Sequence, residues 1–137
     1  MISREQVMDL LLEACPSYRV RWEEYRSAPE FDGELLFVHV GDFADHVVDL
    51  LQRGEPAELA ALARELERLH VEGDDAVKEA ATIGLVEGIQ NAAGHRSVTT
   101  RSLEEALGPE TRRWWRSVDA FWSGKIPHVG ADIDKGS

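Results

Sequence analysis

The chain has almost no cysteine: Cys15 is the only one among its 137 residues. It therefore cannot form an intrachain disulfide or a cysteine-based zinc site. Long apolar runs are missing too, because no stretch approaches the roughly 18 residues that a membrane span requires. The first residues, MISREQ, lack the basic and apolar regions of a signal peptide. These absences predict a cytoplasmic protein with no membrane partner.

Basic charge is also scarce. The chain carries 26 acidic and 15 basic side chains, which gives a net charge of −11. Binding to nucleic-acid phosphates needs a basic surface, so we expect no nucleic-acid partner. The middle of the chain is the acidic part, since residues 41–95 hold twelve carboxylates and only four basic groups. Two interpretations stay open: a charged surface that keeps the protein soluble, or a docking face for a basic protein partner.

Motifs of known chemistry are absent as well. The sequence contains no P-loop, glycine-rich dinucleotide fingerprint, zinc-binding helix motif or calcium loop. None of its five histidines has a serine or cysteine at a spacing that suggests an activated nucleophile. We therefore expect no cofactor and no enzymatic activity.

The segment from Gly73 to Gly94 predicts a central helix over residues 74–93. Asp74 and Asp75 suit the positive end of the helix dipole, and Gly94 suits a left-handed C-cap. Apolar residues recur every four positions, and a second row beside them contains only small residues: Ala80, Gly84, Gly88 and Ala92. Two glycines inside a helix cost about 0.5–1 kcal/mol each relative to alanine. A soluble helix tolerates this cost where a neighbouring backbone must come close, so we expect other helices to pack on this one.

Hydrophobic periodicity and stop signals predict helices along the rest of the chain. They are expected at residues 4–14, 17–27, 42–53, 57–70 and 102–107, with a last helix ending at Gly124. The run at 35–40 is ambiguous, and we expect it to be extended or irregular because no second strand exists to pair with it. The prediction is an all-α, single-domain bundle over residues 1–124. It contains about six to seven antiparallel helices, with HEAT-like hairpins around the helix at 74–93 and a poorly ordered tail at 125–137.

Three stretches carry a family resemblance: GDFADHVVDLL at 41–51, VEGDDAVKEAATIGLVEGIQN at 71–91 and LGPETRRWWRSVDAFWSGK at 107–125. In this order they resemble the DUF7674-type bacterial family of small helical proteins of unknown function. An N-terminal piece around Cys15 and Pro16 fits too. Proteins of this kind look similar to the immunity proteins of polymorphic toxin systems, which are small, acidic, cytoplasmic and helical. The resemblance brings no catalytic residue onto this chain.

Four polar residues share one face of the helix expected at 42–53, at positions i, i+3, i+4 and i+7: Asp42, Asp45, His46 and Asp49. Carboxylates and an imidazole at that spacing can hold a divalent metal if a second helix adds a ligand, for which Glu87 is the candidate. The same face can instead be solvated, or can contact arginine and lysine side chains of a partner. Glu87 lies beside Gly84 and Gly88 on the predicted central helix. We favour a structural role for it, as a surface carboxylate or a hydrogen-bond acceptor.

The last helix carries three tryptophans. Trp114 and Trp122 fit its core stripe, together with Val118 and Phe121. Trp115 lies off that stripe, so it is either an exposed interface anchor or is covered by the N-terminal helices.

The sequence therefore predicts a non-enzymatic acidic protein-binding module, most specifically a cytoplasmic immunity protein that neutralises a cognate bacterial toxin by occluding a basic toxin domain. Its expected partner face comprises Asp42, Asp45, His46, Asp49, Asp74, Asp75, Glu87 and Trp115. Two alternatives remain. One is a metal-dependent or cryptic enzyme, in which Glu87 and His46 converge in a pocket. The other is a scaffold with an apolar groove for a helical peptide.

Overall fold

A computed structural model, which describes residues 1–133, shows that the chain folds into helices joined by loops. In chain order the elements are the 3₁₀ turn η1 (Arg4–Gln6), α1 (Val7–Ala14), the 3₁₀ turn η2 (Pro16–Tyr18), α2 (Arg19–Arg26), α3 (Leu36–Arg53), α4 (Pro56–Glu72), α5 (Asp75–Glu79), the π-helical segment η3 (Ala80–Val86), α6 (Glu87–Arg96), α7 (Arg101–Ala106) and α8 (Pro109–Trp122). Contiguous pieces merge into seven helices, and no strand forms among these residues. The prediction of an all-α, single-domain bundle is confirmed.

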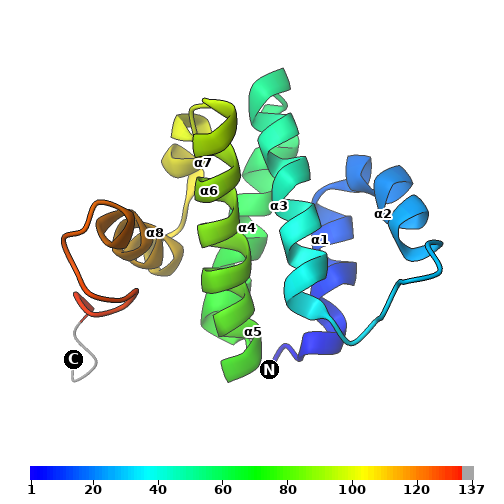
Figure 1. Cartoon of the computed structure of the whole chain (residues 1–137), viewed down its shortest axis with the longest axis horizontal. Coiled ribbons are helices and arrows are strands. Elements are labelled where there is room, and N and C mark those ends of the chain that lie inside the picture. The colour runs from blue at the N-terminus through cyan, green and yellow to red at the C-terminus, as the bar shows by residue number, and fades with distance from the viewer. Residues whose placement is uncertain (134–137) are drawn as a thin grey trace.

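The bundle is arranged around α4 and the continuous α5–η3–α6 helix. In Figure 1, α1 and α2 lie on one side of the molecule, and α7 and α8 lie on the other. Helix α4 contacts both groups, since it packs on α1, α7 and α8. Helix α3 packs mainly on η3 and α6 rather than on its sequence neighbour α4. The long helices thus separate the N-terminal helices from the C-terminal pair.

The small residues of the central helix allow a close approach to α3. Gly84 is buried, and a Cβ atom added there would overlap the side chain of Val40 on α3. One turn later, a Cβ atom at Gly88 would lie 3.2 Å from Cβ of Ala44. The expectation that adjacent backbones approach along this row is therefore confirmed at these two glycines.

The central helix differs from its prediction at its C-terminus and in its interior. Residues Ala80–Val86 form a π-helical segment, and the helix passes through Gly94 to Arg96. Ser97 then adopts the left-handed conformation with φ 55°, which is uncommon outside glycine. The prediction that Gly94 is the C-cap was therefore wrong, because Ser97, three residues later, adopts the left-handed conformation that ends the helix.

The ambiguous run at residues 35–40 belongs to α3. The helix begins at Leu36, so the expectation of extended or irregular backbone was wrong. Its first turns bury Leu36, His39 and Val40, while Phe37 and Val38 are half exposed. This pattern has the spacing of a helix face, and the burial of that face stabilises the turn although no side chain caps its N-terminus.

The buried face of α8 is rotated relative to the predicted stripe. Trp115 is only 5% exposed and Trp122 is 49% exposed, so the assignment of Trp122 to the core was wrong. The buried residues are Thr111, Trp115, Ser117 and Val118. Two of these are polar and hydrogen-bonded, which is why an apolar pattern did not identify the face.

The segment 125–137, expected to be poorly ordered, is described as far as residue 133. Residues 125–133 form bends and a turn beside α8. Gly130 donates its N–H to Ser117 Oγ (2.6 Å), and Ser117 Oγ in turn donates to Asp132 (2.7 Å). Residues 134–137 lie outside the described part of the chain. Within residues 1–133, none of the helices combines the length and the apolar character needed to cross a membrane.

Candidate functional site

The acidic face of α3 is largely engaged by arginines of this same chain. Arg21 on α2 bonds to Asp42 at 2.9 Å and lies 3.5 Å from Asp49. Arg96 on α6 bonds to the other oxygen of Asp49 at 2.7 Å. Asp45 is farthest from these cations, 4.0 Å from Arg21, and its side chain is 55% exposed. Opposite charges within the bundle therefore partly neutralise the α3 part of the predicted partner face, and Asp45 is the most accessible carboxylate of that part.

His46 lies on the inner side of that face. It is buried, and its Nε2 atom is 2.8 Å from the hydroxyl of Ser17. Burial lowers the pKa of His46, and the nearby Arg21 guanidinium lowers it further. His46 thus links α3 to the η2 turn instead of facing an open surface.

The predicted metal constellation does not form. Within residues 1–133, no three His, Cys, Asp or Glu side chains come close enough to share a metal ion. Glu87, the proposed second-helix ligand, is half-buried on α6, which packs on α3 through Gly88 and Ala44. His46 points to Ser17 instead. Asp42 and Asp49 form ion pairs with arginine side chains, so they are not free to bind a metal ion.

Asp74 and Asp75 begin the central helix, as the sequence suggested. Asp74 is the N-cap of α5, and its carboxylate accepts a hydrogen bond of 2.9 Å from Val77 N. Asp75 is exposed in the first turn. Of this pair, Asp75 is the carboxylate that remains available to a partner.

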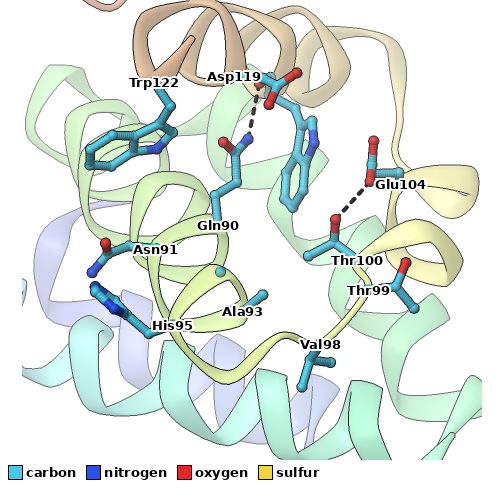
Figure 2. Close-up of a pocket in the computed structure, with 12 residues that line it drawn as sticks. Gln90, Asn91, Ala93, His95, Val98, Thr99, Thr100, Glu104, Asp119 and Trp122 are labelled. Atoms are coloured by element: carbon cyan, nitrogen blue, oxygen red, sulfur yellow. Dashed lines mark hydrogen bonds between the residues drawn. The ribbon is translucent and has the colours of Figure 1, made fainter.

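A groove with a volume of about 700 Å³ lies between α6, α7 and α8. Figure 2 shows Trp122 and Asp119 reaching it from α8, Asn91 and His95 from α6, and Glu104 from α7. Gln90 ties two of its walls together by donating a 3.0 Å hydrogen bond to the carbonyl of Trp115. We refer to this site below as the α6–α8 groove.

The α6–α8 groove combines aromatic surface with negative charge. Trp115 forms a buried wall, and the half-exposed indole of Trp122 lies at the rim. Glu104 accepts a 2.7 Å hydrogen bond from the hydroxyl of Thr100. In the described part of the chain, no basic side chain forms an ion pair with Glu104 or Asp119. An indole beside carboxylates that form no ion pair is an environment that attracts a cation.

A polar cluster joins the start of α8 to α4. Glu67 on α4 accepts hydrogen bonds from the backbone N–H groups of Glu110 (3.1 Å) and Thr111 (2.9 Å), and from the Thr111 hydroxyl (2.9 Å). A carboxylate at this position satisfies N–H groups that the first turn of α8 leaves unpaired. Burial alone would raise the pKa of Glu67, but these hydrogen bonds outweigh it, so the pKa is lowered.

His70 extends this cluster into the core. Its Nδ1 atom is 3.0 Å from the carbonyl oxygen of Leu66, which can only accept, so Nδ1 carries the proton. The same atom is 3.0 Å from Thr111 Oγ1, and Nε2 accepts from the hydroxyl of Thr82 at 3.0 Å. Burial lowers the pKa of His70 and favours its neutral form. The π-helical segment thus connects to α4 and α8 through Thr82.

The groove residues Glu104, Asp119 and Trp122 were not identified from the sequence. Glu104 and Asp119 belong to the part of the chain with a balanced charge, so the acidic composition of residues 41–95 pointed away from them. The available signal was the pair Asp119 and Trp122, which stand three residues apart and therefore share one side of a helix.

Comparison with known proteins identifies the family but no characterised relative. A family model described as a domain of unknown function (DUF7674) matches residues 8–123. No curated protein and no solved structure matches the chain. The HEAT-like comparison therefore stays a prediction. Because the family model spans most of the sequence, the chain belongs to the DUF7674 family.

Proposed function

We propose that the chain is a non-enzymatic protein-binding module that uses the α6–α8 groove to hold a basic surface of a partner protein. The observation that carries this proposal is the half-exposed indole of Trp122 beside Asp119, whose carboxylate no basic side chain of residues 1–133 engages. Tryptophan is enriched among the residues that dominate binding energy at interfaces, especially when it lies next to a pocket. The net charge of −11 adds long-range attraction for a basic partner.

The predicted partner face on α3 is secondary in this account. Arg21 and Arg96 already pair with Asp42 and Asp49, so a partner would have to displace them. Asp45 and Asp75 are exposed and can add to the attraction without that rearrangement. The groove places the carboxylates of Glu104 and Asp119 beside its aromatic wall, which suits a basic loop better than the apolar face of a helical peptide.

In its most specific form, the proposal is a cytoplasmic immunity protein that neutralises a bacterial toxin by covering a basic toxin domain. Acidic composition, helical architecture and the resemblance to immunity proteins support this form. The partner would be encoded beside this chain, as the C-terminal domain of a long secreted protein. Such a partner needs a basic site for nucleic acid or another anionic substrate. Binding of that site in the groove would block access of the substrate.

Co-expression tests the proposal. The neighbouring C-terminal domain is induced in a sensitive bacterial strain with and without this chain. The proposal expects growth to be restored by the wild-type chain and lost with the double substitution Asp119→Asn and Trp122→Ala. A control with Glu30→Gln and Val20→Ala removes one exposed charge and one exposed apolar side chain outside the groove and should still protect. Equal protection by both double variants would contradict the assignment of the groove, and no protection by the wild type would contradict the proposed function.

A further inference from the structure

The start of α3 presents a cluster of apolar side chains to solvent. Leu35, just before the helix, is 48% exposed, and Phe37 and Val38 in its first turn are 45% and 54% exposed. These three residues line a hollow of about 190 Å³ together with Leu36 and Ala76. Figure 1 shows the starts of α3 and α5 at the end of the bundle that carries the N-terminus, apart from α7 and α8. We refer to Leu35, Phe37 and Val38 as the α3 patch.

The α3 patch lies on the side of its helical turn that faces away from the core. The core-facing side of the same turn consists of Leu36, His39 and Val40, which are all buried. Single apolar side chains are common on protein surfaces, but here three occur within four consecutive residues and border one hollow. A contiguous apolar patch with a polar rim is typical of an interaction surface. The next question is which partner its rim suits.

Two exposed residues of opposite charge border the α3 patch. Arg4 and Glu34 line the same hollow. Arg4 donates a 2.6 Å hydrogen bond to the backbone carbonyl of Glu34, so the two residues are neighbours. Neither side chain forms an ion pair within residues 1–133. The rim of the patch therefore carries a positive and a negative group side by side, and both can pair with a charge on another molecule.

This arrangement of charges is self-complementary. A partner surface of a single sign would be attracted by one of the two groups and repelled by the other. Two copies of the chain avoid this conflict when a two-fold axis passes between Arg4 and Glu34. Arg4 of each copy then faces Glu34 of the other, and the α3 patch, which borders both residues, meets the same patch of the other copy. The result has the apolar centre and the polar rim of a protein interface.

We propose that two copies of the chain associate symmetrically through the α3 patch. Leu35, Phe37 and Val38 of one copy pack on the same residues of the other, and two ion pairs between Arg4 and Glu34 form at the rim. The apolar centre has only three large side chains from each copy, and each copy carries a net charge of −11, so the association is weak and depends on concentration. The surface is separate from the α6–α8 groove, so this inference does not depend on the proposed function.

Sedimentation equilibrium of the full chain tests the proposal, in about 0.15 M salt to screen the repulsion between the acidic copies. The average mass is expected to rise from that of one chain towards twice that value between about 10 µM and about 1 mM protein. Val38→Ser should weaken this association at least several-fold. Val20→Ser removes an equally large apolar side chain that is exposed on α2, and it should associate like the wild type. Circular dichroism checks that both variants keep their helices.

Charge reversal identifies the second copy as the partner. Arg4→Glu and Glu34→Arg should each remain monomeric alone, because each places like charges opposite one another across the two-fold axis. An equimolar mixture of the two variants should associate, since every rim contact then joins opposite charges, and the double variant should associate by itself for the same reason.

The matched controls are Arg53→Glu and Glu55→Arg, which make the same changes in net charge at the other end of α3. Each should associate like the wild type, with no gain on mixing. A wild-type chain that stays monomeric up to about 1 mM would overturn the proposal, and so would an association that survives both Val38→Ser and the charge reversals. The same gain on mixing for both pairs of variants would show that net charge alone controls association, which would overturn it as well.

Discussion

Gly84 on the central helix lies directly against the side chain of Val40 on α3, and a methyl group at Gly84 would overlap Val40 Cγ2. Gly84→Ala is therefore expected to lower the free energy of unfolding. Overpacking of this kind costs about 1–3 kcal/mol, which exceeds the gain of up to about 1 kcal/mol that alanine brings to a helix. Urea unfolding followed by circular dichroism measures the difference. A second substitution, Val40→Ala, should recover part of the loss in the Gly84→Ala background.

Gly94 provides the matched control for that experiment. It also lies inside the helix, but a Cβ atom there would meet nothing within 4 Å. Gly94→Ala is expected to raise stability by about 0.5–1 kcal/mol. If the two alanine substitutions changed stability by the same amount in the same direction, the close approach of α3 to the central helix would not hold.

Glu67 is expected to stabilise the start of α8 in a pH-dependent way. Glu67→Ala leaves two backbone N–H groups and the Thr111 hydroxyl without their acceptor, so it should cost about 1–3 kcal/mol at neutral pH. Because the pKa of Glu67 is lowered in the folded state, this contribution is complete above the unfolded-state pKa. It disappears as the pH falls through the folded-state pKa.

The measurement is the difference in unfolding free energy between wild type and Glu67→Ala as the pH is lowered from neutral. The difference should shrink in acid. On the same helix, Glu72→Ala removes only an exposed pair with Arg68 and should cost less than about 1 kcal/mol. A Glu67 effect as small as that of Glu72, or one that does not depend on pH, would contradict the capping role.

His70 should make the protein less stable in mild acid. Its pKa is lowered in the fold from the ordinary 6.5, chiefly by burial, so the unfolded chain binds a proton at a pH where the folded chain does not. The contribution of neutral His70 to the free energy of unfolding is therefore fully present above about pH 6.5. It falls as the pH drops from there towards the folded-state pKa. One such group contributes a slope of up to about 1.4 kcal/mol per pH unit.

The substitution His70→Gln tests this dependence through its slope rather than through its overall stability. The variant should lose part of the decrease in unfolding free energy between about pH 7 and pH 5, with His46 responsible for some of what remains because its pKa is lowered too. A slope that is identical in wild type and His70→Gln would contradict the buried neutral imidazole.

The sequence predicted the helices well where one apolar face dominated. Val77, Leu85 and Ile89 are fully buried, as their spacing indicated, and the small row faces α3 at Gly84 and Gly88. Prediction failed where no local signal marks a boundary. α3 begins without a side-chain cap, so its first turn was predicted to be extended or irregular backbone. Ser97 takes a left-handed conformation that a glycine usually signals, so the end of the central helix was placed too early.

The candidate sites were harder to predict, because they depend on long-range partners. Asp42 and Asp49 were recognised as one helix face, but Arg21 and Arg96, which pair with them, come from two other helices. The face of α8 was misplaced because Thr111 is buried by its hydrogen bonds to Glu67 and His70 rather than by apolar character. Hydrophobic periodicity indicates which face of a helix is buried. It does not indicate which polar side chains form hydrogen bonds or ion pairs with residues of other helices.

The central claim, that the α6–α8 groove holds a basic partner, is tested most directly by a dissociation constant. The proposed partner is the purified C-terminal domain that would be encoded beside this chain. Isothermal titration calorimetry should give tight binding for the wild type. Trp122→Ala should weaken binding by about 2 kcal/mol or more, or roughly 30-fold, as expected for an interface hot spot. Asp119→Asn should weaken it less and reduce its dependence on salt. Val20→Ala, on α2, should bind like the wild type. Binding that is unchanged by Trp122→Ala and Asp119→Asn, or absent at micromolar concentrations of both proteins, would contradict the account.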